Sequence, residues 1–193
     1  MQTITKVYDR YLQAQNAVKE LESAGIASSE ISLLANKSVS DQHADVDDAT
    51  EAGTGAAIGA VAGGAAGLLT GLGLMAIPGV GPVVAAGWFA TTALGALAGG
   101  ATGGIVGALV SSGVSEDHAH VYSEAVRRGG TLLSVKPSDS EVDRVHAILD
   151  RHQPIDPSRQ GTDYRKVGWK AFDPSAEPYD TDATRDDRIR RVS

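Results

Sequence analysis

The sequence predicts an α+β protein: a split ferredoxin-like plait, interrupted by a long glycine-zipper helical hairpin and followed by an extended tail. Two observations lead to this fold class. Outside the middle of the chain, strand-like alternation and helix-like periodicity follow one another in the order β-α-β and then α-β-α-β. Inside it, residues 52–115 contain no Asp, Glu, Lys, Arg or His and hold 18 of the 23 glycines. The charged flanks and the uncharged insert therefore have to be interpreted separately.

The first half of the plait is predicted over residues 1–36. Residues 3–8 alternate apolar and polar side chains and favour a strand, and residues 30–35 favour a second one. Between them, residues 9–24 carry apolar side chains at helical spacing, and Gly25 is placed to end that helix. These apolar residues are Ala14, Ala17, Val18 and Leu21.

The second half is predicted over residues 115–156. Ser115 can cap a helix that stops at Gly129-Gly130, and residues 131–136 favour a third strand. A further helix carries Val142, Val145, Ile148 and Leu149 on one face, and a short fourth strand passes through Ile155. Two split β-α-β halves of this kind predict four strands with helices on one face.

Two segments lack any hydrophobic period. Residues 37–51 are polar and acidic, which is typical of a linker. Residues 157–193 are rich in Pro, Asp and Arg and predict an extended or disordered tail. Trp169 and Phe172 stand out in this tail, and we expect them to anchor it to the chain's own plait or to a neighbouring subunit.

The insert, residues 52–114, repeats glycine every four residues in two series. Helices over 55–77 and 83–110 would be joined by the turn Pro78–Pro82. Each glycine in a helix costs about 1 kcal/mol relative to alanine, so the spacing favours a face where helix backbones pack closely. A tight hairpin within one chain and a contact between copies both remain open. The predicted self-association residues are Gly55, Gly59, Gly63, Gly67, Gly71, Gly87, Gly95, Gly99, Gly103 and Gly107.

Both predicted hairpin helices have the length of about 20 residues that crossing a bilayer requires. Their many glycines and alanines and the acidic residues at both ends of the insert make insertion marginal. The N-terminus has no apolar region behind a basic start, as a secretory signal would have. We therefore expect either the cytoplasmic side of the inner membrane, with lipid as a partner, or the cytoplasm.

The sequence offers little chemistry. There is no cysteine, the net charge of -7 argues against a nucleic-acid binder, and the glycines lack the Lys and Ser/Thr of a phosphate-binding loop. The His and acidic residues that flank the insert are explained by a linker and a helix N-terminus. We predict no catalytic, cofactor-binding or metal-binding residues, and no enzyme.

Three further motifs carry a family resemblance. The insert has a central IPGVGP turn (77–82), a helix ends in Arg-Arg-Gly-Gly (127–130), and the tail has a Trp-x-x-Phe-Asp element (169–173) before Pro178-Tyr179. Together with the opening strand-helix-strand segment, these residues resemble the bacterial heat-induced general stress proteins of the YflT type. The resemblance implies a stress-related protein and carries over no catalytic or cofactor residues.

The leading functional hypothesis is a non-enzymatic protein that self-assembles into homo-oligomers through its hairpins, in or on a membrane. The first alternative is a soluble homo-oligomeric particle with the hairpins buried in its core. The second is a small-ligand sensor module. The sharp composition boundary also predicts that the insert is separable from the folded domain.

Overall fold

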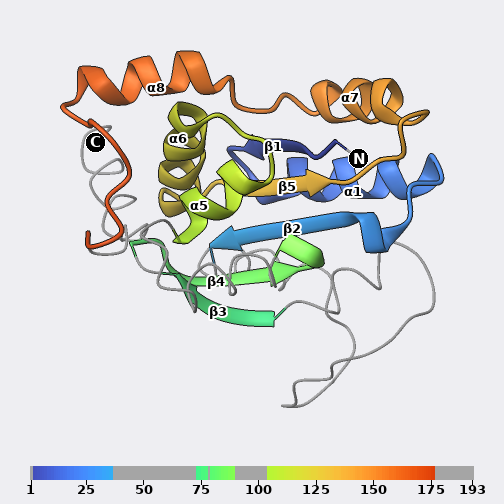
Figure 1. Ribbon diagram of the computed structural model, residues 1–193, viewed down its shortest axis with the longest axis horizontal. Helices are drawn as coiled ribbons and strands as arrows, with labels where there is room; N and C mark the ends of the chain where they lie inside the picture. The colour runs from blue at the N-terminus through green and yellow to red at the C-terminus, as the bar shows by residue number, and fades with distance from the viewer. Residues whose placement is uncertain (1, 37–72, 78, 90–103, 177–193) are drawn as a thin grey trace, which may run out of the picture.

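A computed structural model describes residues 2–36, 73–77, 79–89 and 104–176, and shows an α+β protein (Figure 1). In this part of the chain, one antiparallel sheet holds five strands in the order β1-β5-β2-β4-β3. The strands are β1 (Ile4–Tyr8), β2 (Ile31–Asn36), β3 (Gly73–Ile77), β4 (Gly81–Ala86) and β5 (Thr131–Val135). The helices are α1 (Tyr11–Ser23), α5 (Gly104–Ser111), α6 (Glu116–Arg127), α7 (Val142–Arg151) and α8 (Pro157–Lys166), with a 3-10 turn at Ser28–Glu30. The predicted α+β class is confirmed.

The centre of the sheet is the pairing of both chain halves through β5. This strand lies between β1 and β2 and runs antiparallel to each, with Leu133 opposite Lys6 on one side and Leu33 on the other. The strands β1 and β2 are therefore parallel to each other and are separated by a strand from the other half. A split β-α-β unit predicts this arrangement.

The helical hairpin predicted for the insert is wrong at residues 73–77 and 81–86. Residues 73–77 and 81–86 form β3 and β4, joined by a tight turn, and β4 pairs with β2. A strand buried on both faces is a continuous apolar run, which periodicity alone does not distinguish from a buried helix. Gly79 and Val80 of the Pro-Gly-Val-Gly-Pro sequence thus lie in the turn between these strands. Of the helix expected over 83–110, the part from residue 104 is found as α5.

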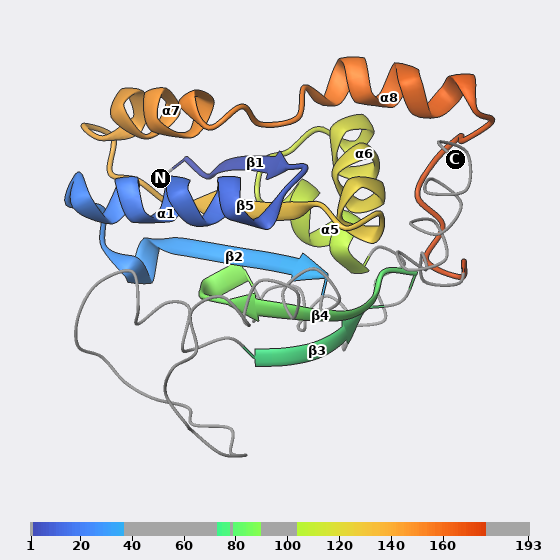
Figure 2. The same ribbon diagram turned by 180° about the vertical axis from the view of Figure 1, so that it is seen from behind.

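Helices cover both faces of the sheet, so the predicted plait with helices on one face is also corrected. Figures 1 and 2 show α1 on one side of the sheet and α5 with α6 on the other. The helices α1 and α7 pack on the first face around Tyr8, Leu33 and Leu133. The helices α5 and α6 pack on the second face, around Val7, Leu34 and Leu132.

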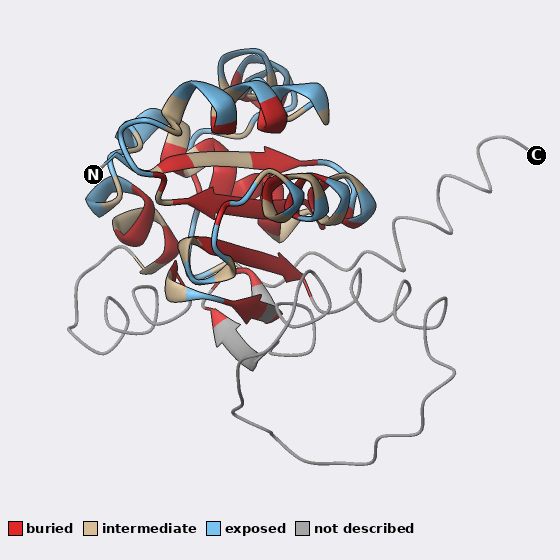
Figure 3. Cartoon of the chain, turned by 90° about the vertical axis from the view of Figure 1, so that its right-hand side faces the viewer, coloured by how far each residue is buried: buried red, intermediate tan, exposed pale blue. Residues whose placement is uncertain are grey.

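This second face draws directly on the insert. Its buried residues from β3 to α5 are Ile77, Val80, Val83, Ala85, Phe89, Ile105, Ala108 and Leu109. Burying a Leu, Ile, Val or Phe side chain stabilises a protein by about 1.5–3 kcal/mol. Figure 3 shows the buried residues concentrated in the strands and in the inner sides of the helices. The described parts of the insert are therefore integral to the domain, which argues against a separable insert.

The structure has no strand at Ile155, where a fourth strand was predicted, and the chain there makes a single backbone hydrogen bond to the sheet. The Ile155 amide donates to the Val7 carbonyl of β1 at 2.7 Å, and the chain then leaves the sheet. Pro154 has no amide hydrogen to offer, and Gln153 has a φ of 56°. The outer edge of β1 is thus covered only at Val7 by the described chain.

The tail begins with a helix rather than an extended segment. Asp156 caps α8 by accepting hydrogen bonds from the Ser158 and Arg159 amides, and Pro157 occupies the first turn. Tyr164 and Gly161 face α6, and the Gly161 position leaves no room for a larger side chain beside Val121. The prediction of an extended tail from residue 157 is therefore wrong for its first ten residues. The linker 37–51 and the tail beyond 176 lie outside the described residues.

Within the described ranges, no helix has the length and apolar character needed to cross a bilayer.

Two neighbouring residues on α5 test whether the insert is part of the core. Leu109 is completely buried, whereas Val110 is 43% exposed. We expect Leu109→Ala to lower the free energy of unfolding by about 2–4 kcal/mol, because it leaves a cavity under the sheet. The matched Val110→Ala change should stay within about 0.5 kcal/mol. Urea unfolding of both variants measures this; equal losses would contradict the packing of α5 described above.

Candidate functional site

Three motifs far apart in the sequence meet at one end of the molecule. They are the β3–β4 turn within residues 77–82, the Arg-Arg-Gly-Gly end of α6, and the segment Trp169–Asp173 after α8 (Figure 1). Phe172 is buried in the same apolar cluster as Ile77 and Val80 of the turn. We call this meeting point the tail junction.

The turn contacts the tail at a glycine, Gly79. A Cβ atom at Gly79 would lie 2.6 Å from the Asp173 carbonyl oxygen and 2.7 Å from the Pro174 Cα atom. Gly79 also has a φ of +75°, which side chains of L-residues rarely adopt. The turn and the tail therefore approach backbone to backbone, and any side chain at this position would separate them.

A buried carboxylate organises the α6 side of the junction. Glu124 is only 1% exposed and accepts hydrogen bonds from two arginines. Arg127 binds it with two parallel bonds of 2.9 and 2.7 Å, and Arg128 Nε donates to it at 2.6 Å. Charge-assisted and bidentate hydrogen bonds of this kind are the strong ones in proteins. Glu124 thus fixes the direction of both guanidinium groups.

The fixed Arg128 holds α8 in turn. Its guanidinium carbon lies 4.3 Å from the centroid of the Tyr164 ring, a cation–π contact. Tyr164 packs edge-on against Trp169 at 5.5 Å, and its carbonyl accepts a hydrogen bond from the Trp169 amide. Burial, the largest cause, raises the pKa of Tyr164. This chain of contacts runs from α6 through α8 to the start of the tail segment.

The two glycines after the arginines end α6. The Gly130 amide donates to the Ala125 carbonyl at 2.8 Å and the Gly129 amide donates to the Val126 carbonyl at 3.0 Å, with Gly129 at a φ of +99°. This is the Schellman pattern of helix termination. The Arg-Arg-Gly-Gly motif therefore combines a helix stop with a clamp for α8.

An exposed acid completes the junction. The pKa of Asp173 is lowered, chiefly because its carboxylate accepts hydrogen bonds from the side chain and the backbone of Ser175, and also because Arg127 lies nearby. The charged form of Asp173 is therefore favoured. In this form the carboxylate holds the turn at residues 173–175, which follows Phe172.

The two predicted tail anchors both contact their own chain. Phe172 is buried beneath the turn, and Trp169 packs on Tyr164. Sequence reasoning identified these aromatic residues but missed Gly79, Glu124 and Tyr164. A signal for Glu124 was available, because arginines three and four positions after a glutamate lie on the same side of a helix.

Two of the ten predicted zipper glycines are described. Gly87 is not in a helix; it has a φ of +86°, and a Cβ atom there would lie 2.4 Å from the Ile31 carbonyl oxygen. Its role is a close backbone approach after β4, which corrects the zipper assignment at this position. Gly107 lies in α5, and no described atom lies within 4 Å of the place its Cβ would take. The other eight lie outside the described residues.

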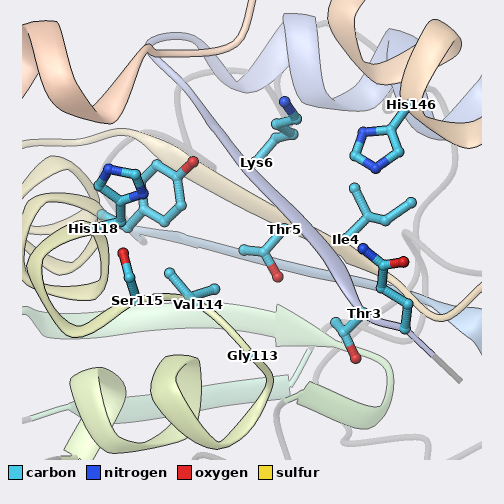
Figure 4. Close-up of a pocket in the computed structure, with 11 residues that line it drawn as sticks. Thr3, Ile4, Thr5, Lys6, Gly113, Val114, Ser115, His118 and His146 are labelled. Carbon is cyan, nitrogen blue, oxygen red and sulfur yellow. The ribbon is translucent and has the colours of Figure 1, made fainter.

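A second feature is a groove along the outer edge of β1, with a volume of about 440 Å³ (Figure 4). Residues Thr3 to Lys6 run along it, with Val114, Ser115 and His118 on one side and His146 of α7 on the other. Tyr122 also lines it, and burial raises the pKa of this tyrosine to about 12, with further contributions from Asp156 and Asp150. Its hydroxyl is therefore neutral at ordinary pH. Among the described residues, no group of three or more His, Cys, Asp or Glu side chains is placed to hold a metal ion.

Comparison of the chain with protein-family models, curated proteins and solved structures finds no match.

The close approach at Gly79 makes a specific prediction. Gly79→Ala should release the segment around Phe172, because the added methyl group overlaps the backbone of Asp173. We expect trypsin to cut after Lys166 or Lys170 at least several times faster than in the unchanged protein. The control is Gly25→Ala, which has a similar φ of +91° but no described atom within 4 Å of the new methyl group. It carries the same backbone strain of about 1–2 kcal/mol, so equal cleavage in both variants would show that the contact does not hold the tail.

A second prediction concerns the carboxylate of Glu124. Glu124→Gln keeps the side-chain shape but removes the charge that both arginines contact, and we expect a loss of about 1–3 kcal/mol in the free energy of unfolding. Glu116→Gln, on the exposed first turn of the same helix, is the control and should change stability by a few tenths of a kcal/mol. Thermal melting distinguishes the two. A melting temperature unchanged by Glu124→Gln would exclude the clamp as a source of stability.

Proposed function

We propose that this chain is a non-enzymatic protein that assembles with its own copies through the glycine-rich segments of residues 52–114. The observation that carries the proposal is the glycine face of α5. Gly107, the last member of the second series, has no described atom within 4 Å of the place its Cβ would take, and Val110 one turn later is exposed. Since residues three apart lie on the same side of a helix, these two form an apolar strip that the described chain leaves uncovered.

The buried side of α5 holds the helix on the domain and so fixes the direction of the strip. Ile105, Ala108 and Leu109 are buried on the sheet, so the opposite side faces outward. Gly95, Gly99 and Gly103 precede Gly107 at four-residue spacing. A helix backbone without side chains on one face allows close approach of a second helix.

The charged groups of the described residues support a structural protein rather than a catalyst. Ion pairs join separate elements: Lys6 of β1 with Asp150 of α7 at 2.9 Å, and Glu20 of α1 with Arg151 of α7 at 2.7 Å. Glu20 also forms a hydrogen bond of 2.8 Å with the Nε2 atom of His152. Together with the Glu124 clamp, these pairs hold the layers of the domain together. A stress-related role follows from the resemblance to the general stress proteins and is part of the same proposal.

Leucine substitutions in the glycine series test assembly directly. Gly63→Leu and Gly99→Leu should reduce the assembly to smaller species, because a bulky side chain holds the helices apart over several turns. Each has a control one residue later, Gly64→Leu and Gly100→Leu, which removes a glycine of the same segment outside the four-residue series. The measurement is size-exclusion chromatography with light scattering, in buffer with and without detergent. If the controls disrupt assembly as strongly as the test variants, or if none of the four does, the zipper is not the contact.

A dependence on detergent distinguishes the setting of the assembly. An assembly that requires lipid or detergent to stay in solution supports the membrane-associated form of the proposal. An assembly of constant size in plain buffer supports the particle with buried glycine-rich segments.

A further inference from the structure

The outer edge of β1 carries backbone groups that point away from the sheet. In an antiparallel pair, residues alternate between those that bond the neighbouring strand and those that face the other way. The Val7 carbonyl accepts a hydrogen bond from Ile155 rather than from β5, so the backbone N–H and C=O groups of Val7 point away from β5. By the same alternation, the backbone groups of Thr5 point away from β5, and so do those of Thr3 just before the strand. The described chain makes no backbone hydrogen bond to either threonine.

The groove leaves these groups accessible. Its lining contains Thr3 and Thr5 themselves, with Gly113 and Val114 from the loop before α6 and His146 from α7 (Figure 4). Lys6, whose charge would blunt a free edge, is turned toward α7 and paired there with Asp150. The edge therefore offers two donors and two acceptors in a trough that is open to solvent.

We propose that this edge pairs with the same edge of a second copy, so that two sheets continue through antiparallel β1 strands. This inference deepens the proposed self-assembly and rests on it. An extended segment could enter the trough from several sources, but a symmetric pair of these edges satisfies every outward donor and acceptor of Thr3 and Thr5 and brings no like charges together. The second copy is therefore the occupant that the residues favour.

The covered position at Val7 fixes the register. A symmetric pair centred on Ile4 places Thr3 opposite Thr5 of the second copy and Thr5 opposite its Thr3. All outward donors and acceptors of these threonines then pair, which gives four hydrogen bonds. A pair centred on Thr5 would place Thr3 against Val7, whose carbonyl is already bonded to Ile155. The Ile4 centre is thus the register that uses both free residues of each chain.

The side chains agree with this register. Threonine opposite threonine is a favourable cross-strand pair, and the two residues lie on the same face of the sheet. Ile4 lies at the centre of the pair, and its own side chain is buried in the core beneath α1 and α7, so the contact is made by the backbone and by the threonines. Lys6 falls opposite Gln2 of the second copy, so no like charges are opposed. The contact is small, and we expect it to add to an assembly rather than to form a stable dimer alone.

The absence of cysteine from the chain allows a test that depends on the register. Full-length Thr3→Cys and Thr5→Cys proteins, carrying tags of different size, are mixed and mildly oxidised. Opposed residues of a bonded antiparallel pair have Cα atoms about 5.5 Å apart, within the range that a disulfide spans. We expect the mixed-size disulfide dimer to exceed both same-size dimers by about tenfold over the random ratio. The random ratio, in which the mixed-size dimer is about twice as abundant as either same-size dimer, or no dimer at all, would overturn the proposal.

A second variant tests the hydrogen bonds without cysteine. Thr3→Pro removes an outward amide hydrogen at the start of an edge strand, where proline is tolerated in the fold. We expect it to weaken association between copies by about tenfold, since two bonds are lost in a symmetric pair. Thr3→Ser, which keeps the amide, is the control. Unchanged association in Thr3→Pro contradicts the edge contact.

The same cross-linking in a Gly63→Leu background separates this inference from the glycine-series proposal. Persistence of the mixed-size dimer there supports the edge contact whatever happens to the larger assembly. If instead Gly63→Leu disrupts the assembly while the unchanged background gives no mixed-size dimer, the edge inference fails and the glycine-series proposal stands.

Discussion

The fold depends on one strand, β5, which pairs with β1 on one side and β2 on the other. Both partners come from the first 36 residues, whereas β5 begins at Thr131. No sheet centre exists without it, because β1 and β2 are parallel and do not touch. Everything else attaches to this trio: α1 and α7 on one face, α5 and α6 on the other, and the β3–β4 hairpin along the free side of β2. The long segment between β2 and β5 is therefore constrained at several points along its length.

The tail junction adds a second level of order. Glu124 positions two arginines, Arg128 positions Tyr164, and the segment from Trp169 to Phe172 follows back to the turn at Gly79. Gly79, Arg128 and Trp169 belong to motifs that stand out in the sequence, but the local pattern of each motif does not show that the three meet. Their convergence links the end of α6, the helix α8 and the middle of the insert. We therefore expect a substitution at one of these points to disturb the packing at the other two.

The elements that sequence reasoning predicted well are those with a clear period and a clear stop. The buried stripe of α1, the glycine pair after α6 and the alternation of β1 and β2 all specify their structure locally. The strands β3 and β4 could not be predicted in this way, because the apolar runs of residues 73–77 and 81–86 have no period of two and resemble a core helix. The helix α8 was missed because its stability comes from Asp156 and from Tyr164 packing on α6, not from an apolar stripe. Of the junction, the aromatic residues were predicted, but the buried glutamate that organises it was not.

The position of β5 also governs how the chain acquires its structure during synthesis. When β1, α1 and β2 have left the ribosome, the gap between the two strands is still empty, and about half the chain must follow before its occupant is made. Contacts this distant in sequence slow folding, because the loop between them has to close before they contribute. Throughout this interval both inner strand edges and the apolar faces of Leu33 and Leu34 are unprotected, a state prone to aggregation. The insertion of β5 between β1 and β2 ends this exposure, so the completion of the second half of the chain protects the first.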